Sequence, residues 1–293
     1  MSHRLHITVP AYAFVSPAES LLIRQRPEAL QAELGWTIQP APLLERHLWG
    51  DGAWLPTAER EADILKALES EVVWASRGGY GCIHLVDCLL RANAPGKPKL
   101  IGYSDITVLH ALWRKRGWGE GYYGTLPKGP GRQHHSFVTL YRGDGLDRSP
   151  ATDAAVRVLH PGQAEGWAFG ACLSVLAGLA GTPAMPSLEG AVLFLEDLEE
   201  RPFQIDGSLT QLHLSGALRG IRGLVGGTFH HQEKSDYQGP MPDELLTQWG
   251  QRLGIPVLSR LPFGHLLDHL IIPQGRRTSL TAGTPWSLRF HAA

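Results

Sequence analysis

The sequence is poor in cysteine, balanced in charge and free of long apolar runs. Its three cysteines among 293 residues are too few, and odd in number, for a disulfide framework, and they fit a reducing compartment. The 27 Lys and Arg residues nearly balance the 28 Asp and Glu residues, so nothing points to nucleic acid or to an anionic membrane surface. No segment approaches the ~20 apolar residues of a membrane span. We therefore expect a globular, cytoplasmic protein without nucleic-acid or membrane partners.

The length of the chain and its 43% of hydrophobic residues suffice for two domains with buried cores. An apolar stretch over residues 5–15 lies near the N-terminus, but it is short and Pro10 interrupts it. This pattern favours a first strand over a signal peptide.

Strand-like and helix-like segments alternate in the first part of the chain. Strands are expected at residues 5–9, 72–75 and 97–102, and helices at 18–34, 59–68, 83–90 and 106–113. Such alternation predicts a parallel sheet with helices on both faces, and functional loops at the carboxyl ends of its strands. Both the glycine loop Arg77–Gly81 and Ser104 follow a predicted strand, so we expect them at that edge.

A second unit is expected to begin near Gly166. Strands are predicted at residues 191–195, 223–227 and 256–258, with short strands over 270–290 and helices at 173–179, after Asp206 and at 243–253. Asp206 and Asp243 are the expected N-caps of the last two helices. Residues 117–131 and 142–150 are rich in Gly, Pro and polar groups and are interpreted as loops. We expect a nucleophile domain over 1–135, a connection over 136–165 and a C-terminal domain over 166–293.

Ser104 stands between an apolar run and an amphipathic stretch, in the segment Ile101–Thr107. A serine at a sharp strand-to-helix turn is held out of the sheet, beside the backbone N–H groups that begin the helix. This setting suits a nucleophile, because those N–H groups can hold the oxyanion of acyl transfer. The alternative is that Ser104 is an ordinary helix N-cap.

Acyl transfer by serine also needs a base and a carboxylate that orients it. Glu196 and His265 each follow an apolar run at an acidic or glycine turn, where strand ends present side chains to a shared cleft. The alternatives are that Glu196 belongs to a solvated acidic face with Asp197, and that His265, one of 14 histidines, is a surface residue.

The glycine loop Arg77–Gly81 has two interpretations. It could cradle a phosphate, but it lacks the spacing of the known phosphate-binding motifs. Alternatively, Gly78 and Gly79 let the backbone approach a substrate and donate an N–H to an oxyanion, together with the N–H of Asp105. Arg77 either reads the carboxylate of a substrate or braces the loop.

Two pairs of adjacent histidines, His134-His135 and His230-His231, could suggest a metal site. Neighbours on a strand face opposite sides, and neither pair has the i, i+4 spacing of a helical site. We expect no metal and no cofactor.

Four motifs in one order resemble those of the serine LD-carboxypeptidases of bacterial murein recycling, a family that also holds the microcin C immunity peptidases. The motifs are the RGGYG loop within Ser76–Gly81, the GxSDxT pattern within Ile101–Thr107, the stretch from Gly181 through Leu193–Asp197 to Asp206, and Pro262–His265 followed by Pro273–Gly275. The resemblance runs from about residue 5 to the C-terminus.

The resemblance implies an α/β protein with an N-terminal flavodoxin-like parallel-sheet domain and a C-terminal mixed α/β domain with a barrel-like sheet. It implies a metal-free hydrolase that acts through Ser104, His265 and Glu196. The substrate would be a murein tetrapeptide, from which a terminal D-alanine is released at an L-centre. It also suggests a cytoplasmic homodimer.

Three departures from the family pattern concern the substrate groove. Gly170-Ala171-Cys172 stands where the family usually has Gly-Gly-Asn, Gly207 replaces the usual Arg, and the segment around Gly124-Thr125 lacks the family's Gly-Pro. Two other functions therefore stay open. One is a microcin-immunity-like peptidase or amidase on a peptide–nucleotide conjugate, and the other is a non-catalytic murein-fragment binder.

Overall fold

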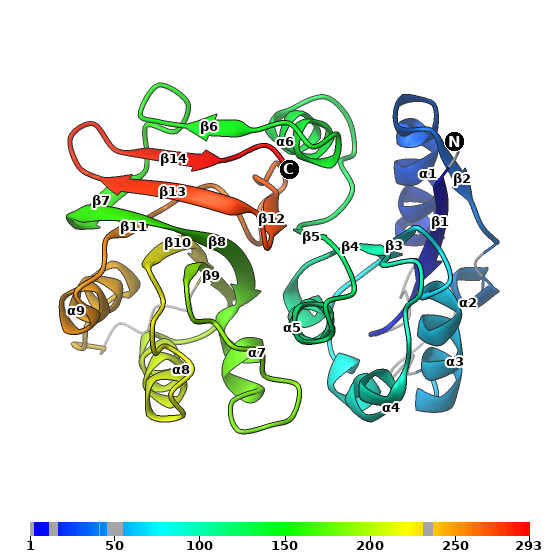
Figure 1. Cartoon of the computed structure of the whole chain (residues 1–293), viewed down its shortest axis with the longest axis horizontal. Coiled ribbons are helices and arrows are strands. Elements are labelled where there is room, and N and C mark those ends of the chain that lie inside the picture. The colour runs from blue at the N-terminus through cyan, green and yellow to red at the C-terminus, as the bar shows by residue number, and fades with distance from the viewer. Residues whose placement is uncertain (1–2, 12–16, 41, 46–54, 231–236) are drawn as a thin grey trace.

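Two sheets, each covered by helices, lie side by side in the computed structural model (Figure 1). It describes residues 3–11, 17–40, 42–45, 55–230 and 237–293. Residues 12–15 of the expected N-terminal apolar segment, and His231, lie outside the described residues. Within the described part, no helix is both long and apolar enough to cross a membrane.

The first sheet has the flavodoxin-like strand order β2-β1-β3-β4-β5, with all of these neighbours parallel. The strands are β1 (His3–Thr8), β2 (Trp36–Ile38), β3 (Val72–Ala75), β4 (Lys99–Gly102) and β5 (Gly121–Tyr123). The helices of this part are α1 (Pro17–Leu34), α2 (Pro42–Glu45), α3 (Thr57–Ala67), α4 (Val86–Arg91) and α5 (Thr107–Arg116). Every residue of β3 is buried, as helices on both faces require.

The second sheet has the order β6-β14-β13-β8-β9-β10-β11-β7. Its strands are β6 (Leu146–Arg148), β7 (Arg157–His160), β8 (Gly162–Cys172), β9 (Ala191–Leu198), β10 (Gly223–His230), β11 (Val257–Ser259), β13 (Arg277–Ala282) and β14 (Ser287–Phe290). The four strands from β8 to β11 are parallel and the outer ones antiparallel. The predicted α/β class is confirmed, whereas the barrel-like closure of this sheet stays a prediction.

The remaining helices are α6 (Arg132–Tyr141), α7 (Leu173–Gly178), α8 (Pro202–Leu214) and α9 (Pro242–Leu253). The predicted caps Asp206 and Asp243 are wrong, because both residues lie inside their helices. The helices begin instead at Pro202 and Pro242, where the missing N–H of proline costs no hydrogen bond.

The two segments interpreted as loops each contain a strand. β5 lies within residues 117–131 and β6 within 142–150. Each strand has only three residues among glycines and polar side chains, so composition concealed it. The expected domain limits stay a prediction.

The two sheets are joined by a shared core and by one crossing strand. Leu109 of α5 and Leu176 of α7 belong to the same buried apolar cluster. β12 (Ile272–Gln274) leaves the second part of the chain and pairs antiparallel with β5. The side-chain amide of Gln274 then donates to the carbonyl of Gly170 on β8 at 2.7 Å and accepts its N–H at 2.8 Å. These contacts fix the position of one sheet against the other.

Candidate active site

Ser104 begins a short 3-10 turn, Ser104–Ile106, between the end of β4 and the start of α5. Its φ of +63° lies in the left-handed region, which costs a residue with a side chain roughly 1–2 kcal/mol. The N-cap interpretation of Ser104 is wrong, because Tyr103 occupies that position and no side-chain capping bond forms. The strained strand-to-helix turn matches the setting in which nucleophilic serines are presented.

The glycine loop packs directly against this turn. A Cβ on Gly78 would lie 2.9 Å from Cβ of Ser104 and 3.3 Å from its Oγ, so only glycine permits the approach. The Asp105 carboxylate is buried, which raises its pKa, and it accepts the N–H of Cys82 at 2.9 Å. The Asp105 side chain thus ties the serine turn to the end of the glycine loop. Gly79 is exposed beside Gly78.

Glu196 lies on β9 with a fully buried side chain, so its assignment to a solvated acidic face is wrong. Its Oε2 lies 2.7 Å from Nδ1 of His265. Burial lowers the pKa of His265, but the hydrogen bond and the charge of Glu196 outweigh it, and the net shift is upward. The carboxylate therefore orients the imidazole and favours its protonation.

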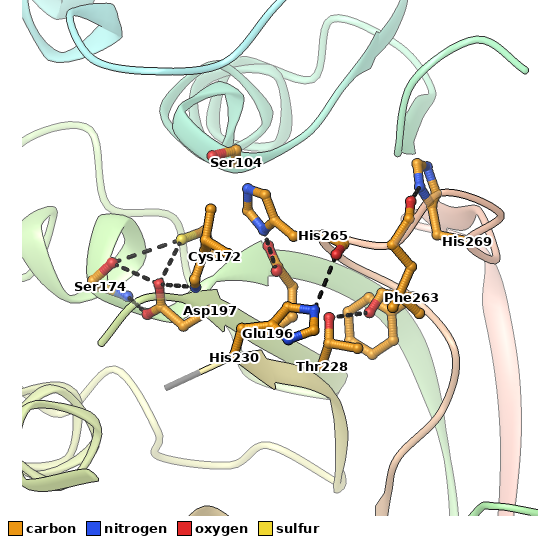
Figure 2. A network of polar contacts seen from close by, with 12 residues as sticks. Ser104, Cys172, Ser174, Glu196, Asp197, Thr228, His230, Phe263, His265 and His269 are labelled. Atoms are coloured by element: carbon orange, nitrogen blue, oxygen red, sulfur yellow. Dashed lines mark hydrogen bonds and ion pairs between the residues drawn. The ribbon is translucent and has the colours of Figure 1, made fainter. Parts of the chain in front are cut away.

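His265 is placed with one ring edge on Glu196 and the other directed toward Ser104 (Figure 2). Its side chain is 15% exposed, so the imidazole can meet a substrate. No hydrogen bond joins Ser104 Oγ to His265 in the described part of the chain. Contacts of this kind are often long in unliganded enzymes and tighten when substrate binds.

Tyr123 is a buried site residue that sequence reasoning missed. Its hydroxyl accepts the N–H of Ser104 at 3.2 Å and donates to Oε1 of Glu196 at 2.7 Å. It lies at the end of β5, within the segment interpreted as a loop. In the sequence, Tyr123 is marked only by its place between Gly121 and Gly124, and that spacing does not identify a strand.

A cavity of about 290 Å³ adjoins the serine turn. Gly78 and Tyr103 line it on the side of Ser104, and Leu266 lines it on the side of His265. Arg77 also lines it, which places this side chain beside the site without deciding between its two expected roles.

The three departures from the family pattern lie in different surroundings. Cys172 is buried beside Glu196, with its thiol 3.2 Å from Asp197, and burial raises its pKa well above the usual value. Thr125 lines the cavity and Cys172 pairs with Glu196 across neighbouring strands, whereas Gly207 is exposed on α8 and does not line the cavity.

One histidine of each pair has a described polar contact. His134 pairs with Glu33 at 3.0 Å, and Nε2 of His230 lies 3.1 Å from the carbonyl oxygen of His265. Over the described residues, no three His, Cys, Asp or Glu side chains are grouped to hold a metal ion.

The fold and the serine turn place the molecule among the two-part serine hydrolases. Models of the LD-carboxypeptidase N-terminal and C-terminal domains match residues 7–124 and 165–280. A "Putative carboxypeptidase" of Streptomyces coelicolor is 34% identical over 280 residues, which cover 88% of this chain and 87% of that protein. The chain therefore belongs to the LD-carboxypeptidase family and is a serine peptidase.

Solved structures show the same fold over the whole chain. The muramoyltetrapeptide carboxypeptidase from Oxalobacter formigenes superposes with a TM-score of 0.78 at 25% identity, covering 98% of this chain and 99% of that one. An MccF-like protein from Bacillus anthracis has a TM-score of 0.80 at 20% identity, covering 100% and 97%. MccF is a microcin C7 self-immunity protein.

Proposed function

We propose that the protein releases a terminal D-alanine from a murein tetrapeptide through Ser104, His265 and Glu196. The observation that carries this proposal is the 2.7 Å contact between His265 and the buried Glu196, with the free ring edge directed toward the strained serine. The family and the name of the Oxalobacter structure support the class of substrate.

The first half of the reaction forms an acyl-enzyme. Ser104 Oγ attacks the carbonyl carbon of the L-centre while Nε2 of His265 takes the serine proton. The N–H of Asp105 and an N–H of Gly78 or Gly79 hold the resulting oxyanion. The C–N bond then breaks as His265 returns the proton to the leaving amine of D-alanine.

The second half hydrolyses the acyl-enzyme. A water gives its proton to His265 and attacks the ester carbonyl, and His265 then protonates Ser104 as the tripeptide leaves. Glu196 stays ionised throughout, because its role is to orient the imidazole and stabilise the imidazolium. No step in this sequence needs a cofactor.

A panel of murein peptides, with products identified by mass, tests the proposal. The tetrapeptide should yield D-alanine and the tripeptide with the wild-type enzyme and not with Ser104→Ala. Ser187→Ala, which removes an exposed hydroxyl, is the matched control and should keep full activity. Turnover by Ser104→Ala close to wild type would refute the nucleophile.

The second candidate is a peptidase or amidase that acts on a peptide–nucleotide conjugate, which the MccF-like neighbour keeps open. An aminoacyl-adenylate analogue belongs in the same panel. Its cleavage in place of the tetrapeptide would favour this candidate. Cleavage of neither would favour the murein-fragment binder considered from the sequence. Gel filtration would test the expected homodimer.

A further inference from the structure

The cavity beside Ser104 is lined by three cationic side chains from separate segments. Arg26 comes from α1, Arg77 follows β3 and Lys128 follows β5. None of the described lining residues is acidic. A cleft lined by one sign of charge concentrates ions of the opposite sign, since its low-dielectric walls focus the field lines.

Arg26 has a buried N–H donor without a hydrogen-bond acceptor among the described residues. Its Nη1 donates to Oγ1 of Thr125 at 3.2 Å, but its Nε is buried and has no partner among the described residues. Burial also lowers the pKa of this guanidinium. A buried donor left unmatched is costly, so the geometry favours an anion that accepts from it.

His269, Thr125 and Gln133 line the cavity and are hydrogen-bonded to one another. Nε2 of His269 accepts from the N–H of Thr125 at 3.2 Å and from Nε2 of Gln133 at 3.1 Å. Its Nδ1 then donates to the carbonyl of Leu266 at 3.0 Å, and burial lowers its pKa. His269 is therefore neutral at pH 7, and the positive charge comes from the arginines and the lysine.

Thr125 holds this arrangement through two contacts. Its N–H is accepted by His269, and its hydroxyl accepts from Arg26. Thr125 therefore anchors Arg26 at the wall of the cavity, which both residues line.

We propose that this cavity binds the α-carboxylate of the amino acid that is released, with Arg26 as its principal partner. The inference rests on the proposed function. The cavity borders Tyr103, which precedes Ser104, and Leu266, which follows the histidine that protonates the leaving amine. In a carboxypeptidase the terminal carboxylate lies one residue from the scissile carbonyl.

The size of the cavity agrees with this occupant. Its volume of about 290 Å³ is many times the ~30 Å³ that one water occupies. A small amino acid therefore fits there with some water. Recognition of the carboxylate would restrict cleavage to the last peptide bond.

Turnover of the tetrapeptide and of its C-terminal amide gives the first test. Arg26→Met should lower kcat/KM on the free acid by about tenfold or more, mainly through KM, since a charge-assisted hydrogen bond is lost. Its kcat/KM on the amide should change little. Arg26→Lys should recover part of the loss. Thr125→Val, which removes only the hydroxyl, should have a kcat/KM on the free acid between those of wild type and Arg26→Met. Arg222→Met, at an exposed arginine away from the cavity, is the control. Equal losses on acid and amide would overturn the proposal.

Binding of D-alanine and D-alaninamide, observed by ligand NMR, needs no turnover. The wild-type protein should bind D-alanine, whereas the Arg26→Met variant should not. D-alaninamide should bind to neither protein. Equal binding of D-alanine to both proteins, its failure to bind wild type, or stronger binding of inorganic phosphate would overturn the proposal. If the tetrapeptide is not cleaved yet D-alanine binding depends on Arg26, the proposed function fails and the cavity assignment stands.

Discussion

Tyr123 and Glu196 come from different sheets and share a buried hydrogen bond of 2.7 Å. The same phenolic oxygen accepts the N–H of Ser104. Burial raises the pKa of Tyr123 well above its usual value, so the hydroxyl keeps its proton. One side chain therefore couples the serine turn to the carboxylate that orients His265.

We expect Tyr123→Phe to lower kcat about 10- to 100-fold while KM changes little, because a lost hydrogen bond to a charged group is worth roughly 1.5–3 kcal/mol. Glu196 would lose a donor that offsets its charge, so the carboxylate should stabilise protonated His265 more strongly and raise its pKa further. The acid limb of the pH–rate profile should therefore move to higher pH. Steady-state kinetics over a range of pH measures both effects.

Tyr122→Phe is the matched control for this variant. Tyr122 is the neighbouring buried residue of β5, and its hydroxyl donates to Glu120 at 2.9 Å, away from the serine turn. It should lose stability without a change in the pH profile. If the two variants behave alike, Tyr123 is structural only.

The pH dependence of the enzyme follows from the upward pKa shift of His265. The proposed base works only when neutral, so kcat/KM should fall as the pH drops through a value above about 6.5, the ordinary pKa of histidine. The raised folded-state pKa stabilises the fold below the unfolded pKa, and this contribution is lost as the pH rises through the folded one.

Glu196→Gln should reverse the shift, since the opposing effect of burial remains when the charge is removed. Its residual activity should show an acid limb at lower pH than that of wild type. His134→Gln, which removes a surface pair with Glu33, should leave the profile unchanged. An acid limb that stays in place in Glu196→Gln would contradict the assignment of His265 as the base.

The sequence was sufficient to predict the elements that carry apolar runs and the residues that end them. Ser104, Glu196 and His265 stand out because each follows such a run at a turn. Tyr123 and Arg26 do not, because their roles depend on contacts with residues 73 and 99 positions away in the chain. No local pattern encodes these distances.

Short strands are the other feature that could not be predicted from the sequence. β5 and β12 have three residues each, too few for a periodicity, and they form because neighbouring strands supply hydrogen-bond partners. The crossing of β12 to the first sheet is likewise a property of the assembled fold. The predicted caps were wrong for a local reason, because a proline at the first helical position, and not the aspartate, marks the start of each helix.

Gly78→Ala should impair activity more than stability. The added methyl group would meet Cβ of Ser104 at 2.9 Å and the carbonyl of Tyr103 at 3.1 Å, so either the loop or the serine turn must move. We expect a loss of kcat of about 10²-fold, the order seen when reacting groups are displaced by about 1 Å. Gly96→Ala, where the nearest atom is 3.6 Å away, is the control on the same part of the chain. Equal activity of the two variants would contradict a close approach.

Gly264 positions the Glu196–His265 pair from the other side. Its φ is +98°, and a Cβ there would lie 2.5 Å from Oε2 of Glu196. Gly264→Ala should therefore both strain the backbone, by about 1–3 kcal/mol, and push the carboxylate away from His265. We expect a lower midpoint of chemical denaturation together with a strong loss of kcat.

Gly207→Ala should stabilise the protein, in contrast to Gly264→Ala. Gly207 lies in α8, where an added Cβ meets nothing within 4 Å. Alanine there reduces the freedom of the unfolded chain and should stabilise the protein by about 0.4–1 kcal/mol. Activity should stay at the wild-type level, because the position is exposed and separate from the cavity. A loss of tetrapeptide turnover in Gly207→Ala, with stability intact, would show that α8 contributes to the substrate groove.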